Sequence, residues 1–454
     1  MSSFDFAKAF PNPTEVRESL LPGLAVKPWS SSPQGKFYLL NATVVDARNS
    51  KLLDGPQFIE VQNGVINSVQ PLNSFDRSKL DDNALAYDVS GKFISPGLID
   101  AHVHVTAVPG VETMADMVRL PEQSVTLRAT YVLKNMLHRG FTTVRDTGGA
   151  NKIIADALKE GLIEGPRLFQ CGKALSQTGG HGDFISPGVS GGDGTSCCGG
   201  HAISLGRTAD GVPAVLKAVR EELKQGADFI KIMLGGGVSS ESDAIETVQY
   251  TAEEVRAITS TCWQMGKKMA TAHAYTVDAI NHAIDNGVKG IEHGNLMDAP
   301  TAKRMAENGV YLTPTLSCYG IMVRKPFEKF LNDEGKNKSV QVMQQGLQAL
   351  KLAEEAGVTV CYGSDLLISM HALQTEEFTV RSTVLPSATL LRHATVNPAK
   401  MLGQEGRLGV IAPGAIADIL ILENNPLDDI TVLDRPETNL RAVLKEGKLV
   451  AGKL

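Results

Sequence analysis

Through the middle of the chain, short apolar runs alternate with longer segments in which apolar residues recur at helical spacing. Eight strand-like runs lie at residues 98–105, 142–148, 167–172, 229–234, 269–275, 290–295, 311–316 and 358–365. The amphipathic segments between them include residues 125–140, 213–226, 251–266 and 339–357, and each of these four ends at a glycine, a common helix C-cap. Strands and helices alternate in this way in parallel α/β folds. We therefore predict a (β/α)8 TIM-like barrel over residues 95–401.

The two ends of the chain have a different pattern, in which short β-rich runs are separated by turns. The pairs Asn63-Gly64 and Glu446-Gly447 each lie between two such runs, which predicts two hairpins. We predict that residues 36–94 and 402–454 together form one small β-sandwich domain and that the barrel is inserted between them. Residues 1–35 match neither pattern, and we expect an N-terminal arm that takes part in contacts of a homo-oligomer.

Composition narrows the possible partners and location. The chain has 50 acidic and 44 basic residues among 454, a formal net charge of −6, and neither sign gathers in long runs. No nucleic-acid or anionic-membrane partner is therefore indicated. No apolar run approaches the ~18 residues that a membrane span requires. Six cysteines are too few for a disulfide framework in a chain of this length, so we expect a cytoplasmic protein with reduced thiols.

Four histidines lie on predicted strands. His102 and His104 are two residues apart in the first run, so both side chains point to the same face, and Asp100 precedes them at the same spacing. His273 and His293 lie near the C-terminal ends of the fifth and sixth runs, where barrel enzymes carry their catalytic groups. Each histidine alone is more often a structural residue. Four facing one another are natural metal ligands.

Two charged residues complete this set. Asp365 ends the eighth run after two small residues, where its carboxylate could bind a cation or cap the next helix. Lys231 lies in the apolar run FIKIML, where an ammonium ion is costly. A neutral amine can react with carbon dioxide, and the resulting carbamate could bridge two divalent metal ions. The alternative is a lysine that pairs with a barrel carboxylate or extends to solvent.

The chain resembles the amidohydrolase superfamily from about residue 36 to the C-terminus. The resemblance rests on residues that occur in the same order: the D-x-H-x-H of the first strand, the lysine of the fourth, the histidines of the fifth and sixth and the aspartate of the eighth. Further motifs are similar to its metal-dependent prolidase and carboxypeptidase branch, which includes ochratoxin-hydrolysing enzymes: GGHGD at 179–183, KIMLGGGVSS at 231–240, TVQY at 247–250, HAY, IEHG, GSD and the pattern AD-x-x-x-L-E-x-NPL-x-D-I at 417–430. The chain departs from the family pattern in having Gly-Ser-Asp where Gly-Thr-Asp is common.

The resemblance implies a role for each matching residue. His102, His104 and Asp365 would bind one metal ion, His273 and His293 would bind the other, and carboxylated Lys231 would bridge the two. Zinc suits imidazole and oxygen ligands in a hydrolytic site. A hydroxide shared by the two ions would attack the substrate, and Asp365 would take a proton and pass it to the leaving nitrogen.

Two more residues are candidates for substrate contact. His181, in the loop motif GGHGD, could polarise the substrate carbonyl or hold the substrate, or it could be a structural loop residue. Tyr250 matches a family position that contacts a substrate carboxylate, although without the resemblance it is an ordinary residue before a helix. No arginine or lysine in the matched loops can be assigned as a carboxylate clamp.

The branch resemblance implies a small-molecule or dipeptide substrate. The expected reaction cleaves an amide bond and releases a C-terminal amino acid from an Xaa-Pro dipeptide, an N-acyl amino acid or an ochratoxin-like amide. Two alternatives remain open. A cyclic amidohydrolase opening a hydantoin, lactam or lactone would use the same centre, and a metal-free scaffold would keep only the fold. Retention of all six ligands argues against the scaffold.

Overall fold

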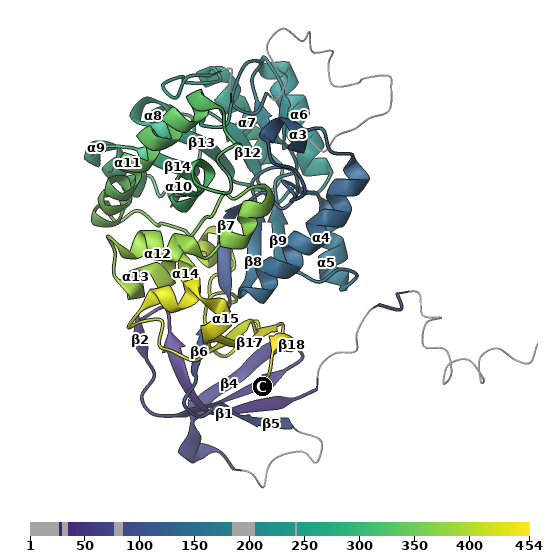
Figure 1. Ribbon diagram of the computed structural model, residues 1–454, viewed down its shortest axis with the longest axis vertical. Coiled ribbons are helices and arrows are strands. Elements are labelled where there is room, and N and C mark those ends of the chain that lie inside the picture. The colour runs from purple at the N-terminus through teal and green to yellow at the C-terminus, as the bar shows by residue number, and fades with distance from the viewer. Residues whose placement is uncertain (1–26, 30–34, 77–84, 184–204, 241–242) are drawn as a thin grey trace, which may run out of the picture.

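The computed structural model describes residues 27–29, 35–76, 85–183, 205–240 and 243–454. The predicted N-terminal arm therefore lies outside the described residues except for 27–29 and 35. Two layers of structure are visible in Figure 1: a β-rich part below, and above it a larger part in which helices surround parallel strands. None of the helices among the described residues combines the length and hydrophobicity needed to cross a lipid bilayer.

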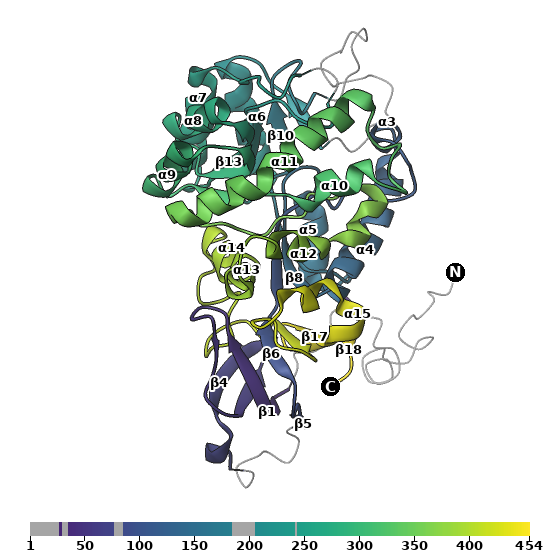
Figure 2. The same cartoon turned by 60° about the vertical axis from the view of Figure 1, so that its left-hand side comes forward.

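The two ends of the chain meet in one sheet, where the purple and yellow strands of Figures 1 and 2 lie together. Its strands are β1 (Phe37–Asp46), β2 (Lys51–Leu52), β3 (Gln57–Gln62), β4 (Val65–Pro71), β5 (Leu85–Asp88), β6 (Phe93–Pro96), β16 (Ile419–Leu422), β17 (Leu440–Lys445) and β18 (Lys448–Gly452). The main path runs β18-β17-β16-β6-β1-β3-β4. Strand β6 joins the two ends, because it pairs with β1 on one side and with β16 on the other.

Both predicted hairpins are confirmed. Antiparallel β3 and β4 are joined at Asn63 and Gly64, and antiparallel β17 and β18 are joined at Glu446 and Gly447. All four turn residues have positive φ angles between 50° and 77°. Two-residue turns of this kind match the twist of the paired strands, which explains why glycine stands second in each.

The middle of the chain forms two parallel sheets. The first consists of β7 (Leu98–Val103), β8 (Phe141–Asp146) and β9 (Arg167–Gln170). The second has the order β11-β10-β12-β13-β14-β15 and consists of β10 (Ala174–Ser176), β11 (Gly206–Thr208), β12 (Ile230–Met233), β13 (Ala270–Thr276), β14 (Gly290–Leu296) and β15 (Tyr311–Thr313). Seven of the eight predicted runs therefore contain a strand of these sheets.

The eighth predicted run, residues 358–365, differs from the prediction because it forms no continuous strand. Its single bridge pairs Val360 with Leu312 of β15. Beyond this point the backbone partners change: the Tyr362 amide donates to the His393 carbonyl at 2.7 Å, while the Asp365 amide donates to the His102 carbonyl at 2.9 Å. The segment therefore lies between β15 and β7 without keeping a ladder with either.

Helices cover the outside of these strands in Figures 1 and 2. The helices of the described residues are α3 (Met114–Met117), α4 (Glu122–His138), α5 (Lys152–Glu160), α6 (Val212–Lys224), α7 (Ala252–Gln264), α8 (Val277–Asp285), α9 (Ala299–Glu307), α10 (Ser317–Val323), α11 (Asp333–Ala356), α12 (Glu376–Ser382), α13 (Ser387–His393), α14 (Val396–Met401) and α15 (Pro436–Asn439), with 3-10 turns η2 (Leu72–Ser74), η4 (Ile368–Leu373) and η5 (Ile430–Asp434). Of these, η2 and α15 lie beside the sheet of the two chain ends. The four predicted helical segments correspond to α4, α6, α7 and α11. Their apolar faces pack on the strands, which are buried almost throughout.

Candidate metal centre

The six predicted metal ligands line one cavity. Four lie in strands: His102 in β7, Lys231 in β12, His273 in β13 and His293 in β14. His104 lies one residue beyond the end of β7, and Asp365 ends the irregular segment 358–365. His102 is the second-last residue of β7, His273 and His293 are the middle residues of β13 and β14, and Lys231 is the second residue of β12. Parallel strands that lie side by side bring these side chains to one cavity. The cavity volume is about 60 Å³.

Three of these residues, which we call the Asp365 group, are His102, His104 and Asp365. The Nε2 atoms of His102 and His104 each lie 3.3 Å from Asp365 Oδ1. The donor atoms of all three residues lie within 4.8 Å of one another, an arrangement that could hold a metal ion. A borderline cation with imidazole and carboxylate ligands fits this donor set.

The other three residues, Lys231, His273 and His293, form what we call the Lys231 group. The ring centroids of His273 and His293 are 4.5 Å apart. The two groups are adjacent, because the His293 ring lies 5.0 Å from the His102 ring and its Nδ1 lies 3.9 Å from Asp365 Oδ2.

Every histidine of the two groups has one ring nitrogen held by the protein. His102 Nδ1 donates to Glu292 Oε2 at 2.8 Å, and His104 Nδ1 donates to the Gly148 carbonyl at 3.0 Å. His273 Nε2 donates to the Gly236 carbonyl at 3.0 Å, and His293 Nδ1 shares a hydrogen bond with Thr315 Oγ1 at 2.8 Å. The Nε2 atoms of His102 and His104 face Asp365, and His104 Nε2 also lies 3.4 Å from Thr147 Oγ1. A hydrogen bond to one ring nitrogen orients the ring, as in metal-binding histidines generally.

Lys231 lies in an environment that disfavours the charged form of its amine. Its side chain is 1% exposed, and within the described residues it makes no ion pair or side-chain hydrogen bond. Burial lowers the pKa of Lys231, and the charges of Glu292 and Asp365 only partly offset this effect. A carbamate on this nitrogen would replace an uncompensated amine with an anionic metal ligand, so the site fits a carboxylated lysine.

The carboxylate of Asp365 sets the charge of its own group. Burial opposes its ionisation, but the charges and hydrogen bonds of His102 and His104 hold the pKa of Asp365 well below its usual value. Burial would lower the pKa of His104, but Asp365 raises it above the ordinary value. In the Lys231 group, burial lowers the pKa of His273 and His293 well below the usual range, so both imidazoles are neutral.

The backbone bends sharply at two of the predicted ligands. His293 has φ of 74° and Asp365 has φ of 50°, in the left-handed region that few residues other than glycine adopt. Gly363 shows how closely the chain passes the centre, because a Cβ there would lie 2.9 Å from His102 Cβ. Such backbone strain is common where side chains are held for function.

His181 reaches this cavity from the GGHGD loop. Its ring stacks on His273 with centroids 4.2 Å apart, and its Nδ1 lies 3.0 Å from Ser240 Oγ. The ring lies against the backbone of Gly237, where any Cβ would collide with it. Gly237 in turn donates its amide to Asp243 Oδ2 at 3.1 Å, so the glycine-rich loop is held in the shape that admits the histidine.

Tyr250, the other predicted substrate contact, is not among the residues that line this cavity. Its side chain is 4% exposed within a core cluster, and its hydroxyl has no hydrogen-bond partner among the described residues. Two other tyrosines line the cavity instead. Tyr275 and Tyr319 are joined by a 2.9 Å hydrogen bond between their hydroxyls.

Two buried charged residues behind the cavity were not predicted. Glu292 accepts hydrogen bonds from His102, from the Arg145 guanidinium and from Thr271, and the Arg145 charge helps to hold its pKa well below the usual value against the effect of burial. Arg145 also donates Nε to the Ala101 carbonyl at 2.6 Å. Both residues lie in buried strands that contain other polar residues, FTTVRD in β8 and GIEHGNL in β14, so neither stands out in the sequence as Lys231 does in its apolar run.

The rest of the cavity wall is largely apolar. It includes Met114, Met233, Val238, Met322 and Leu367, and Lys231 is its only lysine or arginine among the described residues. A substrate would therefore meet polar groups on the histidine side and apolar groups on the other.

Comparison with known proteins gives the family of the chain. The family model described as "Amidohydrolase family" matches residues 93–450. Ochratoxinase of Aspergillus niger is 31% identical over 327 residues, which cover 70% of this chain and 66% of ochratoxinase, slightly less than two thirds of its length. A prolidase structure complexed with N-methylphosphonate-L-proline has 41% sequence identity and a TM-score of 0.86, covering 92% of this chain and 100% of the prolidase. A Xaa-Pro dipeptidase structure with bound methionine in its active site has 29% sequence identity and a TM-score of 0.80, covering 91% of this chain and 99% of the dipeptidase. The chain belongs to the amidohydrolase family.

Proposed function

We propose that the protein is a two-metal hydrolase that cleaves an amide bond and releases a C-terminal amino acid. The observation that carries this proposal is the set of four histidines, each oriented by a hydrogen bond at one ring nitrogen, around Asp365 and a buried Lys231 that makes no ion pair among the described residues. The similarity to ochratoxinase and to prolidases supports an amide or peptide bond as the target.

The Asp365 group would hold one divalent ion, and His273 and His293 would hold the other. A carboxylated Lys231 would connect them. Zinc suits these ligands. When bound, such ions polarise a carbonyl group and make a water molecule acidic near neutral pH.

The protein's own residues would move the proton and hold the substrate. Asp365 would take a proton from the attacking water and deliver it to the amide nitrogen as the bond breaks. His181, which is above the ring of His273, would donate a hydrogen bond to the substrate carbonyl oxygen. The apolar wall would receive the side chain of the substrate and exclude bulk water.

We also propose that the two parallel sheets and residues 358–365 close into a (β/α)8 barrel. Backbone hydrogen bonds support closure on both sides. The Asp228 amide before β12 donates to the Gln170 carbonyl of β9 at 2.8 Å, and the Ala101 amide of β7 donates to the Tyr362 carbonyl at 2.8 Å. The sheet shared by the two chain ends would be the companion β-sandwich domain.

A second candidate reaction is the opening of a cyclic amide. The observation that favours it is the cavity wall, which among the described residues offers no lysine or arginine besides Lys231 for the carboxylate of an amino acid product. A hydantoin or lactam needs no such clamp.

One hydrolysis screen tests both candidates. Protein loaded with zinc is incubated with Xaa-Pro dipeptides, N-acyl amino acids and ochratoxin A, and separately with hydantoins, lactams and lactones, and Asp365→Asn protein serves as the control. We expect free amino acid from the first group only. Ring opening without release of an amino acid would replace the first proposal with the second, and no hydrolysis of either group would contradict both.

A further inference from the structure

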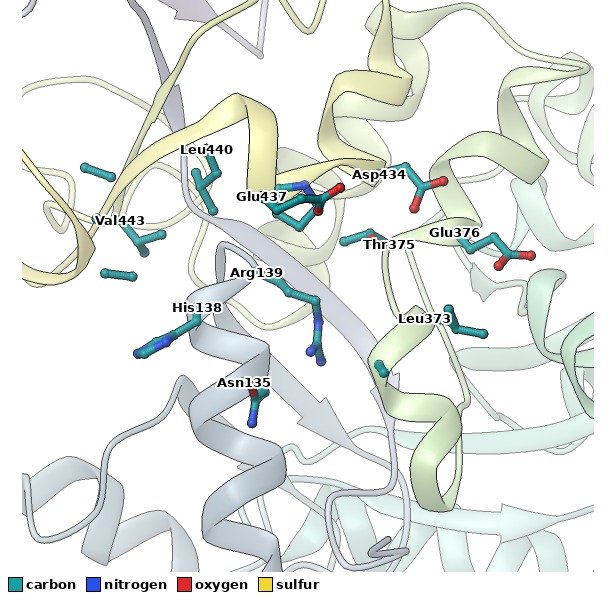
Figure 3. Close-up of a pocket in the computed structure, with 15 residues that line it drawn as sticks. Asn135, His138, Arg139, Leu373, Thr375, Glu376, Asp434, Glu437, Leu440 and Val443 are labelled. Carbon is teal, nitrogen blue, oxygen red and sulfur yellow. The ribbon is translucent and has the colours of Figure 1, made fainter. Parts of the chain in front are cut away.

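A second and larger cavity lies away from the candidate metal centre. Its volume is about 560 Å³, within the range typical of small-molecule sites. It is formed where the end of α4 meets the start of α12 and the C-terminal segment around α15 and β17, as Figure 3 shows. None of the six proposed metal ligands lines it.

One wall of this cavity carries a guanidinium group without an anionic partner. Arg139 follows α4, and its Nε and Nη2 both donate to Gln374 Oε1, at 3.3 Å and 3.0 Å. Among the described residues it forms no ion pair, and its Nη1 makes no hydrogen bond. Burial lowers the pKa of Arg139 to about 10, so the group stays charged at neutral pH. A partly buried cation of this kind is stabilised by an anion that binds beside it.

The C-terminal segment contributes the opposite charge. In Figure 3 the carboxylates of Asp434 and Glu437 lie above the Arg139 guanidinium. Neither forms an ion pair within the part of the chain that the structure describes, and Asp434 Oδ2 accepts a hydrogen bond from Thr379 Oγ1 at 2.5 Å. The third carboxylate of the lining, Glu376, is already bound by Arg324 at 2.8 Å and 2.5 Å.

We propose that this cavity binds a free α-amino acid as its zwitterion. The ligand carboxylate would bind Arg139, whose planar donors match a carboxylate, and its ammonium group would face Asp434 and Glu437. A simple anion would be repelled by the two carboxylates, and a simple cation would be repelled by Arg139. Leu373, Leu440 and Val443 also line the cavity and would contact an apolar side chain.

The position of Arg139 connects this site to the metal centre. Gln374, which accepts from Arg139, donates its Nε2 to Asp100 Oδ2 at 2.9 Å. Asp100 Oδ1 in turn accepts from the backbone amide of His102 at 3.1 Å. Metal content must therefore be measured for every Arg139 variant, because a disturbance could spread along this path.

The test uses the twenty free L-amino acids as probes of the full-length, metal-loaded protein. A thermal-shift screen identifies those that bind, and equilibrium dialysis counts equivalents per chain. We expect the wild-type protein to bind one equivalent of at least one amino acid that the Arg139→Gln protein does not bind. The Glu437→Gln protein should bind this equivalent about tenfold more weakly than the wild type. The control Arg220→Gln, an exposed arginine of α6, should keep that equivalent. The N-acetyl and amide forms of the same amino acid should not bind at this site, since each lacks one charge.

Glu437 is exposed, so its substitution is compatible with folding even if that of Arg139 is not. The proposal is overturned if the binding of no amino acid is weakened by both Arg139→Gln and Glu437→Gln. Binding of the N-acetyl or amide form as tightly as the free amino acid would also overturn it. None of these measurements involves hydrolysis, so a failure of the proposed function would leave the result intact.

Discussion

The Asp365 group and the Lys231 group face the same cavity but differ in charge. The first combines two imidazoles with a carboxylate, and this carboxylate raises the pKa of His104. The second combines two imidazoles with an amine, and burial keeps the pKa of its histidines well below the usual range. The Lys231 group contains no carboxylate of its own, and the nearest one that contacts it is Asp365, whose Oδ2 lies 3.9 Å from His293 Nδ1. The proposed two-metal centre therefore depends on the proposed carboxylation of Lys231.

The largest effect is expected when Asp365→Asn removes the only carboxylate of the first group. Loss of proton transfer should lower kcat by roughly 10⁴-fold, since general acid–base catalysis contributes up to that amount. Steady-state kinetics with a hydrolysed substrate from the screen would measure it. Activity within a factor of ten of the wild type would show that another group carries the proton.

Lys231→Ala tests the second group. We expect loss of bound metal and a fall in activity of roughly 10³-fold, because a bound cation contributes several kcal/mol to the transition state. Short carboxylates added to the buffer should restore part of both, which elemental analysis and kinetics would detect. Lys217→Ala, at a lysine 76% exposed on α6, is the control. An unchanged metal content in Lys231→Ala would remove the carbamate from the proposal.

A substitution at Gly237 can displace the His181 ring without replacing His181 itself, because a Cβ at residue 237 would collide with that ring. We expect Gly237→Ala and His181→Asn each to lower kcat by about 10²-fold, as loss of one hydrogen bond to a developing oxyanion does. Gly235→Ala is the matched control in the same loop, since a Cβ there would meet atoms only at ordinary contact distances of 3.4 Å or more. Equal effects at both glycines would indicate damage to the loop and not displacement of His181.

The smallest effect is expected behind the Asp365 group, at Glu292. Glu292→Gln should weaken metal binding by about 10 to 100-fold, because His102 loses the charged acceptor that fixes its ring. A competition titration with a chelator would measure the affinity directly. If metal binding is unchanged, the Glu292 and Arg145 pair stabilises the core without acting on the ligand.

Much of the architecture could be read from local patterns. The Asn63-Gly64 and Glu446-Gly447 turns, the helices with terminal glycines and seven of the strands follow from the identity of neighbouring residues. The eighth run was misread as a regular strand because its composition is strand-like, while its backbone partners change along the segment. Whether the six candidate ligands bind metal stays a prediction, although the structure brings them to one cavity.

The sequence alone determined which residues carry unusual chemistry, because a lysine in an apolar strand and histidines near strand ends stand out locally. Only the tertiary structure decided which of them act together. Glu292 meets His102 across 190 residues and Arg145 across 147, and such contacts depend on how whole strands pack. The same reason applies to Tyr250, whose motif suggested the substrate but whose side chain packs in a core cluster. Local patterns specify turns and periodicity, whereas the direction of a side chain in the folded protein is set by everything that packs around it.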